Sequence, residues 1–136
     1  MEEKEVKELI KKIKKERDRS LNFYRLLLKT DPEMMKKWDD LYSSEKFKER
    51  FLSAREKELI DLSLSTVLKW GIGLQIHLKK AVEMGITEQE IMEVFSLTAM
   101  TAGIPCMMFA SDVYTELKKN NFRYSFPQCD LEDVSS

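Results

Sequence analysis

Residues that end helices are scarce in this chain, and this scarcity most constrains its fold. Four glycines and three prolines occur among 136 residues, so long stretches run without a turn signal. The alternation of apolar and polar residues that is typical of a half-buried strand is nowhere sustained. Apolar residues instead recur at helical spacing with charged residues between them. The sequence therefore predicts an all-α fold.

The length predicts one domain, because 136 residues suffice for a single hydrophobic core but not for two. We expect helices in residues 1–50, a helical core in residues 51–119 and a polar tail in residues 120–136. A tail of this composition becomes ordered only by docking against the rest of its domain.

In the N-terminal part, apolar positions from Val6 onward predict one amphipathic helix. This helix should end near Lys29, because Pro32 disfavours helical geometry at Asp31. Pro32 can then open a second helix over residues 33–42, with Asp31 as its cap.

The core is expected to contain four helices whose ends carry specific signals. Ser53 with Glu56, and Thr87 with Glu90, have the spacing of capping boxes, in which a hydroxyl and a glutamate satisfy free backbone N–H groups. Gly85 can take the positive φ that ends a helix. We expect a central antiparallel pair of helices with two flanking helices, over residues 55–70, 73–84, 87–102 and 105–119.

The charge balance bears on the class of partner. The net charge is −1, and lysines and glutamates are interleaved along the first fifty residues, so no one-sided basic surface for nucleic acid is expected.

The abundance of Lys and Glu beside only three Asn and three Gln is typical of proteins from hot environments. The eight methionines argue against that origin.

Cysteine and histidine usage argues against a metal centre. Cys106 and Cys129 are far apart in the sequence, and His77 is the only histidine, so a zinc site of the usual ligand count cannot be assembled. We expect no metal and no cofactor. The chain begins with charged residues and not with an apolar signal segment, which favours free thiols in the cytoplasm.

The segment Val94–Ser111 is eighteen residues long and has no charged residue, which is near the lower limit for a membrane span. It contains Gly103, Pro105 and several hydroxyl residues, and it follows a strong helix cap. We therefore expect a buried or subunit-interface segment, no membrane partner, and a homo-oligomer that covers the excess apolar surface.

Glu58 precedes His77 by nineteen residues, and each lies in one of the two central helices. A carboxylate and an imidazole that meet between apolar helices can transfer protons. Gly71 and Gly73 should loosen the backbone before the helix of His77, and Gly73 leaves space one turn before the ring. The competing interpretations are that His77 makes one structural hydrogen bond and that Glu58 is a solvated charge.

Three segments carry a resemblance to a known family. They are Leu52-Ser-Ala-Arg-Glu-Lys-Glu58-Leu-Ile with Ile76-His77-Leu, then Met84-Gly-Ile-Thr-Glu-Gln-Glu-Ile91, and Ala102-Gly-Ile-Pro105. Over residues 52–110 the chain resembles the carboxymuconolactone decarboxylase family, which includes the alkyl hydroperoxidase D proteins. The resemblance implies a helical fold, assembly as a dimer, trimer or hexamer, and catalytic roles for Glu58 and His77.

The chain departs from the peroxidase branch of that family. That branch has a Cys-x-x-Cys pair twelve residues after the glutamate, and here Trp70 and Gly73 stand in its place. Thiol peroxidase chemistry needs an attacking thiolate and a resolving thiol, so the family's peroxiredoxin activity should be absent. The decarboxylase branch also lacks the pair. Its dianionic lactone substrate requires a cationic clamp, for which nearby cations are Arg55, Lys69, Lys79 and Lys80.

Three residues are candidates for contact with a substrate. Trp70 is either an aromatic wall of a small pocket or a plug that fills the volume of the missing side chains, and Gly73 lies within the same motif. Cys106 reaches the site from the turn after Pro105, unless it is a small buried hydrophobe.

The sequence is compatible with three functions. The first is an enzyme that uses Glu58 and His77 as a proton relay on a small carbonyl or carboxylate compound. The second is a non-catalytic family member that acts in an oligomer as a small-molecule-binding or protein-interaction module, with the Lys- and Glu-rich N-terminal half as a docking surface. The third is a thiol-dependent peroxidase that works through Cys106.

Overall fold

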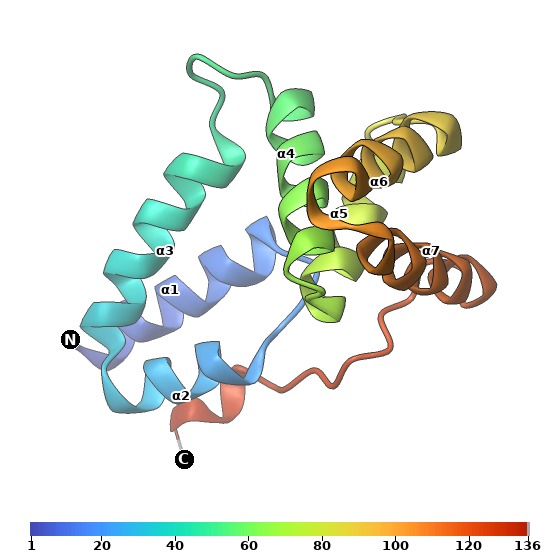
Figure 1. Cartoon of the computed structure of the whole chain (residues 1–136). Coiled ribbons are helices and arrows are strands. Elements are labelled where there is room, and N and C mark those ends of the chain that lie inside the picture. Colours follow the sequence, from blue (N-terminus) through green and yellow to red (C-terminus); the bar gives the residue numbers. More distant parts are fainter. Residues whose placement is uncertain (136) are drawn as a thin grey trace. The chain divides into compact units, whose positions relative to one another are not determined.

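The computed structural model describes residues 1–135, and in them it is all-helical, with seven α-helices, one 3₁₀ helix and no strand (Figure 1). The predicted all-α class is confirmed. Contacts divide the chain into two compact units, one comprising Met1–Lys48 with the end of the chain from Pro127, and the other comprising Glu49–Phe126. The prediction of one domain stays a prediction.

The first unit contains α1 (Glu3–Glu16), α2 (Asn22–Thr30), α3 (Pro32–Phe47) and the 3₁₀ helix η1 (Glu132–Ser135). Helix α2 packs against α3 and η1, and α1 contacts both α3 and η1. Their apolar faces form one core, made of Leu9, Ile10, Ile13, Tyr24, Leu28, Met35 and Leu131.

The predicted single helix as far as Lys29 is wrong. Helix α1 ends at Glu16, and Arg17 is extended, with φ −131° and ψ 141°. The side chain of Arg17 is fully buried and donates to Asp39 of α3, with 2.5 Å between Nη2 and Oδ1. The break reverses the chain, so that the apolar face of α2 joins the same core as that of α1.

The start of α3 follows the prediction, but its end does not. Asp31 accepts a hydrogen bond from the backbone of Met34, and Pro32 occupies the first turn, as expected. The helix continues five residues beyond the expected end at residue 42, to Phe47. Its buried face includes Asp39 and Ser43, and these polar residues hid the helical periodicity of the sequence.

The second unit contains α4 (Ala54–Val67), α5 (Gly71–Glu83), α6 (Glu88–Ala102) and α7 (Ile104–Lys119). Helix α4 packs against the other three, and α7 also packs against α5 and α6. The buried core of this unit consists of Leu62, Leu74, Leu78, Ala81, Ile86, Ile91, Phe95, Ala110, Tyr114 and Leu117.

Local signals set most ends of these helices. Both predicted capping boxes are present, at Ser53 before α4 and at Thr87 before α6. Gly85 ends α5 with φ +83°. The next residue, Ile86, is buried and donates its N–H to the carbonyl of Ala81, as expected for a left-handed helix end.

The turn between α4 and α5 differs from the prediction. Gly71 and Gly73 lie within the first turn of α5 and do not loosen the backbone before it. Lys69 instead makes the reversal, with φ +50°. Its N–H donates to the carbonyl of Thr66, and the N–H of Trp70 donates to that of Ser65, so the end of α4 is satisfied without glycine.

The uncharged run Val94–Ser111 is divided between two helices. Gly103 separates α6 from α7 with φ +99° and ψ 154°, a conformation open mainly to glycine. Within residues 1–135, no helix combines the length and apolar character that crossing a membrane requires.

We predict that Gly85→Ala destabilises the protein by about 1–2 kcal/mol, the cost of a left-handed conformation for a residue with Cβ. A Cβ at this position meets no atom within 4 Å, so the loss comes from the backbone alone. Urea denaturation measures it, and Gly85→Asn should recover part of the loss because Asn tolerates positive φ. An unchanged midpoint for Gly85→Ala would contradict this account.

Candidate functional site

The buried faces of α4 and α5 bring the relay residues together. Glu58 and Leu62 lie one turn apart on the buried face of α4. On α5, His77 lies between the core residues Leu74 and Leu78. The Ser53 cap fixes where α4 starts, and therefore which of its carboxylates points toward α5.

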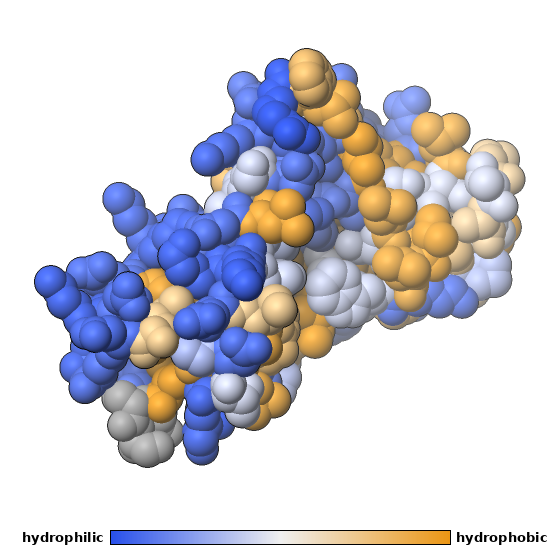
Figure 2. All heavy atoms as spheres, turned by 90° about the vertical axis from the view of Figure 1, so that its left-hand side faces the viewer, coloured by the Kyte–Doolittle hydropathy of each residue, from blue (hydrophilic) through white to orange (hydrophobic). Residues whose placement is uncertain are grey.

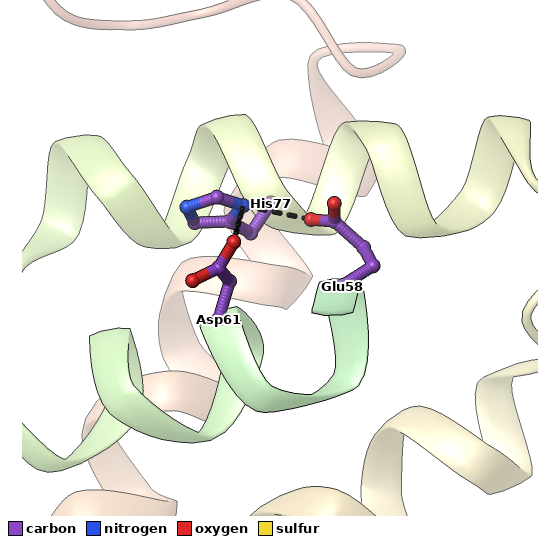
Figure 3. Close-up of side chains that lie close together, drawn as sticks. All are labelled: Glu58, Asp61 and His77. Atoms are coloured by element: carbon purple, nitrogen blue, oxygen red, sulfur yellow. Dashed lines mark hydrogen bonds and ion pairs between the residues drawn. The ribbon is translucent and has the colours of Figure 1, made fainter. Parts of the chain in front are cut away.

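His77 and Glu58 form a direct hydrogen bond. Nδ1 of His77 is 2.7 Å from Oε1 of Glu58, and 3.9 Å from Oδ2 of Asp61 (Figure 3). The side chains of Glu58 and His77 are 3% and 11% exposed, so the bond is largely shielded from water. The predicted contact between the two residues is confirmed.

The hydrogen bond orients the imidazole. An ionised carboxylate only accepts, so opposite the ionised form of Glu58 the Nδ1 atom carries the hydrogen, and the bond holds the ring in one orientation. The other ring nitrogen, Nε2, points away from Glu58 (Figure 3). It forms no hydrogen bond with residues 1–135 and is the atom available to a ligand.

Two further charged residues complete the site. Asp61 lies one turn after Glu58 on α4, with a side chain that is 13% exposed. Nζ of Lys80, one turn after His77 on α5, is 3.6 Å from Oε2 of Glu58. The sequence interpretation missed Asp61, although its spacing of three residues from Glu58 was a signal. It considered Lys80 only as one of several nearby cations.

The side chains of Glu58, Asp61 and His77 lie close enough together to bind a metal ion. One ligand atom from each of Glu58, Asp61 and His77 lies within 4.8 Å of the others, a donor set that suits a divalent cation. The ammonium of Lys80 already places a positive charge beside Glu58. The expectation of no metal stays a prediction.

Trp70 fills the space that Gly73 leaves. A Cβ built on Gly73 would lie 2.0 Å from Cε3 of the Trp70 indole, so the ring rests directly on the glycine. The expected room one turn before His77 is therefore occupied, which corrects the sequence interpretation. Trp70 keeps 48% of its surface exposed. The contact agrees with the plug interpretation and leaves the outer face of the ring in solvent.

The two cysteines are placed in different units. Cys106 is buried in the first turn of α7, with Sγ 3.8 Å from the carbonyl oxygen of Ala102. Cys129 belongs to the first unit, where Sγ is 3.6 Å from the carbonyl oxygen of Ser20. Both thiols are free. Cys106 does not belong to the cluster of Glu58, Asp61 and His77.

These features define a helical protein with a buried Glu–His pair between two packed helices and no thiol pair beside it. The sequence matches the carboxymuconolactone decarboxylase family over residues 32–116, and the chain belongs to that family. The resemblance seen over residues 52–110 is thus confirmed, and the match also includes α3. A comparison with proteins of curated function gave no match.

We predict that Gly73→Ala destabilises the protein by about 1–3 kcal/mol, because the new methyl group must displace the Trp70 ring. The emission of Trp70 should move to longer wavelength as the ring enters water. In a Trp70→Ala background the same change should be neutral or stabilising, since alanine favours helix over glycine. Equal destabilisation in both backgrounds would show that the two residues do not interact.

Proposed function

We propose that the protein is an acid–base enzyme that acts on a small carboxylate compound, with His77 as the proton donor and Glu58 as the residue that orients it. The observation that carries the proposal is the buried 2.7 Å hydrogen bond between them, together with an Nε2 that no residue of 1–135 engages. Family membership supports decarboxylation as the reaction class.

The proposed step is the loss of CO₂ from a substrate carboxylate. The carbon–carbon bond to that carboxylate breaks, and its electron pair passes into an adjacent unsaturated carbonyl system. The Nε2–H of a doubly protonated His77 then gives its proton to carbon, which leaves the neutral ring with its hydrogen on Nδ1. Water returns the proton. Glu58 keeps the Nδ1 hydrogen bond throughout, and its negative charge stabilises the imidazolium.

Charge around the site supports an anionic substrate. An anion that approaches His77 from the Nε2 side would interact with the imidazolium, and Lys80, with Nζ 3.6 Å from Oε2 of Glu58, adds a positive charge to the same cluster of residues. Gly73 lies one turn before His77 on α5 and Trp70 caps the start of that helix, two turns before His77; we assign both residues to the wall of the substrate site. Cys106, which is buried in the first turn of α7, is a third candidate for a residue that contacts the substrate.

The test is CO₂ release from 4-carboxymuconolactone by the wild type and by His77→Gln and Glu58→Gln. We expect each variant to lose about 10²- to 10⁴-fold in kcat, the usual contribution of a positioned acid or base. Gln75→Glu is the matched control, because it changes charge on the same helix and its side chain contacts Ser125 outside the relay. Its kcat should remain near that of the wild type.

Circular dichroism must show that both relay variants remain helical, so that a loss of turnover reports chemistry. Equal turnover in His77→Gln and the wild type would overturn the relay. Peroxide consumption with a dithiol reductant that disappears in Cys106→Ser would instead assign the chemistry to that thiol.

A non-catalytic role is the second candidate, and the indole packed on Gly73 favours it. In that case the buried pair joins α4 to α5, and the ring of Trp70 fills the space beside Gly73. His77→Gln would then lower the melting temperature, and the wild type would release no CO₂ from any lactone carboxylate. Activity of the wild type that is lost in a folded His77→Gln variant excludes this candidate.

We also propose that the protein is a homo-oligomer in the cytoplasm. Large apolar side chains of α6 and α7 are exposed, including Leu97 at 70% and Met100 at 72%. Hydrophobic residues also gather in patches on another face, the left-hand side of Figure 1, which Figure 2 presents. Patches of this kind mark protein–protein interfaces. The free thiols of Cys106 and Cys129 are typical of a reducing compartment.

We predict that the double variant Leu97→Glu, Met100→Glu lowers the molar mass measured by light scattering at micromolar concentration, because charges are costly within an apolar interface. Leu41→Glu is the control, since Leu41 is 65% exposed on α3. This control should keep the mass of the wild type. A monomeric wild type would refute the proposed assembly.

A further inference from the structure

A cavity lies within the first unit, and neither Glu58 nor His77 is among the residues that line it. Its volume is about 430 Å³, within the usual range for small-molecule sites. Residues of α1, α2 and η1 line it, and η1 contacts both of these helices (Figure 1). The cavity therefore needs no residue of the second unit.

The inner surface of this cavity is apolar. Val6 and Ile10 lie one turn apart on α1 and face Leu28 of α2 and Val134 of η1. Ile10 and Leu28 are buried members of the core of the first unit, and Val6 and Val134 pack against that core. A hydrocarbon chain in this cavity would extend an existing core and displace water from its wall.

The rim of the cavity is charged, and among the side chains that the structure describes its charges do not cancel. Lys7 pairs with Glu3 at 2.6 Å. The other acidic residue of the rim, Glu132, pairs with Lys14 at 2.8 Å. Lys11 and Lys29 also line the cavity, and neither forms an ion pair with a side chain that the structure describes. Two uncompensated ammonium groups thus lie beside an apolar cavity.

We propose that this cavity binds a free, single-chain anionic amphiphile, a carboxylate on a hydrocarbon chain. The chain lies against Val6, Ile10 and Leu28, and the carboxylate interacts with Lys11 and Lys29. A cationic ligand would meet repulsion from these lysines, because both rim carboxylates are already paired. The site is independent of the proposed decarboxylase chemistry, since the two share no residue.

The test is calorimetric titration of the whole chain with octanoate, decanoate and dodecanoate, each below its micelle concentration. Each added pair of methylenes should tighten binding by about 15-fold, while the chain remains within the cavity. The double variant Lys11→Gln, Lys29→Gln should weaken decanoate binding at least tenfold and leave the weaker binding of decanol unchanged. The matched control is Lys4→Gln, Lys15→Gln, which removes two exposed lysines of α1 that do not line the cavity.

A second variant probes the apolar part of the site. Val6→Phe should fill the cavity and abolish decanoate binding, with circular dichroism to verify the helical fold. His77→Gln should bind decanoate as the wild type does, which separates this proposal from the proposed catalytic site. Equal binding by the two lysine double variants would overturn the proposal, as would affinity that does not depend on chain length. Binding to anionic phosphatidylglycerol vesicles without binding to free decanoate would also overturn it, because the lysines would then face a membrane.

Discussion

The hydrogen bond between His77 and Glu58 is the interaction on which the arrangement of α4 and α5 depends. Both side chains are buried, so neither can return to water without separating the two helices. Loss of Glu58 removes the hydrogen bond of a buried ring nitrogen, which costs about 1–3 kcal/mol, whereas loss of His77 leaves Glu58 with its ion pair to Lys80. The apolar core residues Leu62, Leu74 and Leu78 pack on the same helices as the pair. Because their side chains offer no hydrogen-bond partner, Glu58 and His77 must satisfy each other.

The first unit is organised by a buried charge of its own. Asp39 is fully buried and accepts from Arg17 and from Lys12, at 2.5 and 2.8 Å. The guanidinium of Arg17 also lies over aromatic rings, 4.6 Å from the ring centre of Tyr42 and 5.1 Å from that of Trp38. The hydrogen bond to Asp39 raises the pKa of Lys12, and burial raises the pKa of Tyr24. This buried pair is the reason that the chain breaks after α1.

The sequence allowed prediction of those features that depend on neighbouring residues. The caps at Ser53 and Thr87 and the stop at Gly85 are local, and the structure has all three. The break at Arg17 was missed because it depends on Asp39, which lies twenty-two residues away. Within the site, resemblance to a family identified Glu58 and His77, and packing alone revealed the rest. Asp61 looked like one more helix-surface charge, and the position of the Trp70 ring could not be derived from helical periodicity.

The contact between Trp70 and Gly73 restricts the order in which this sequence can change. A side chain at position 73 collides with the indole, so a cysteine there must displace the ring while the tryptophan remains. Position 70 must change first, and only then does position 73 have room for a thiol. The reverse path has the same dependence, because the bulky ring can occupy its place only after position 73 has lost its side chain. The two positions are therefore coupled in order: a side chain at position 73 meets a steric barrier while Trp70 remains, and this barrier is absent once position 70 has changed.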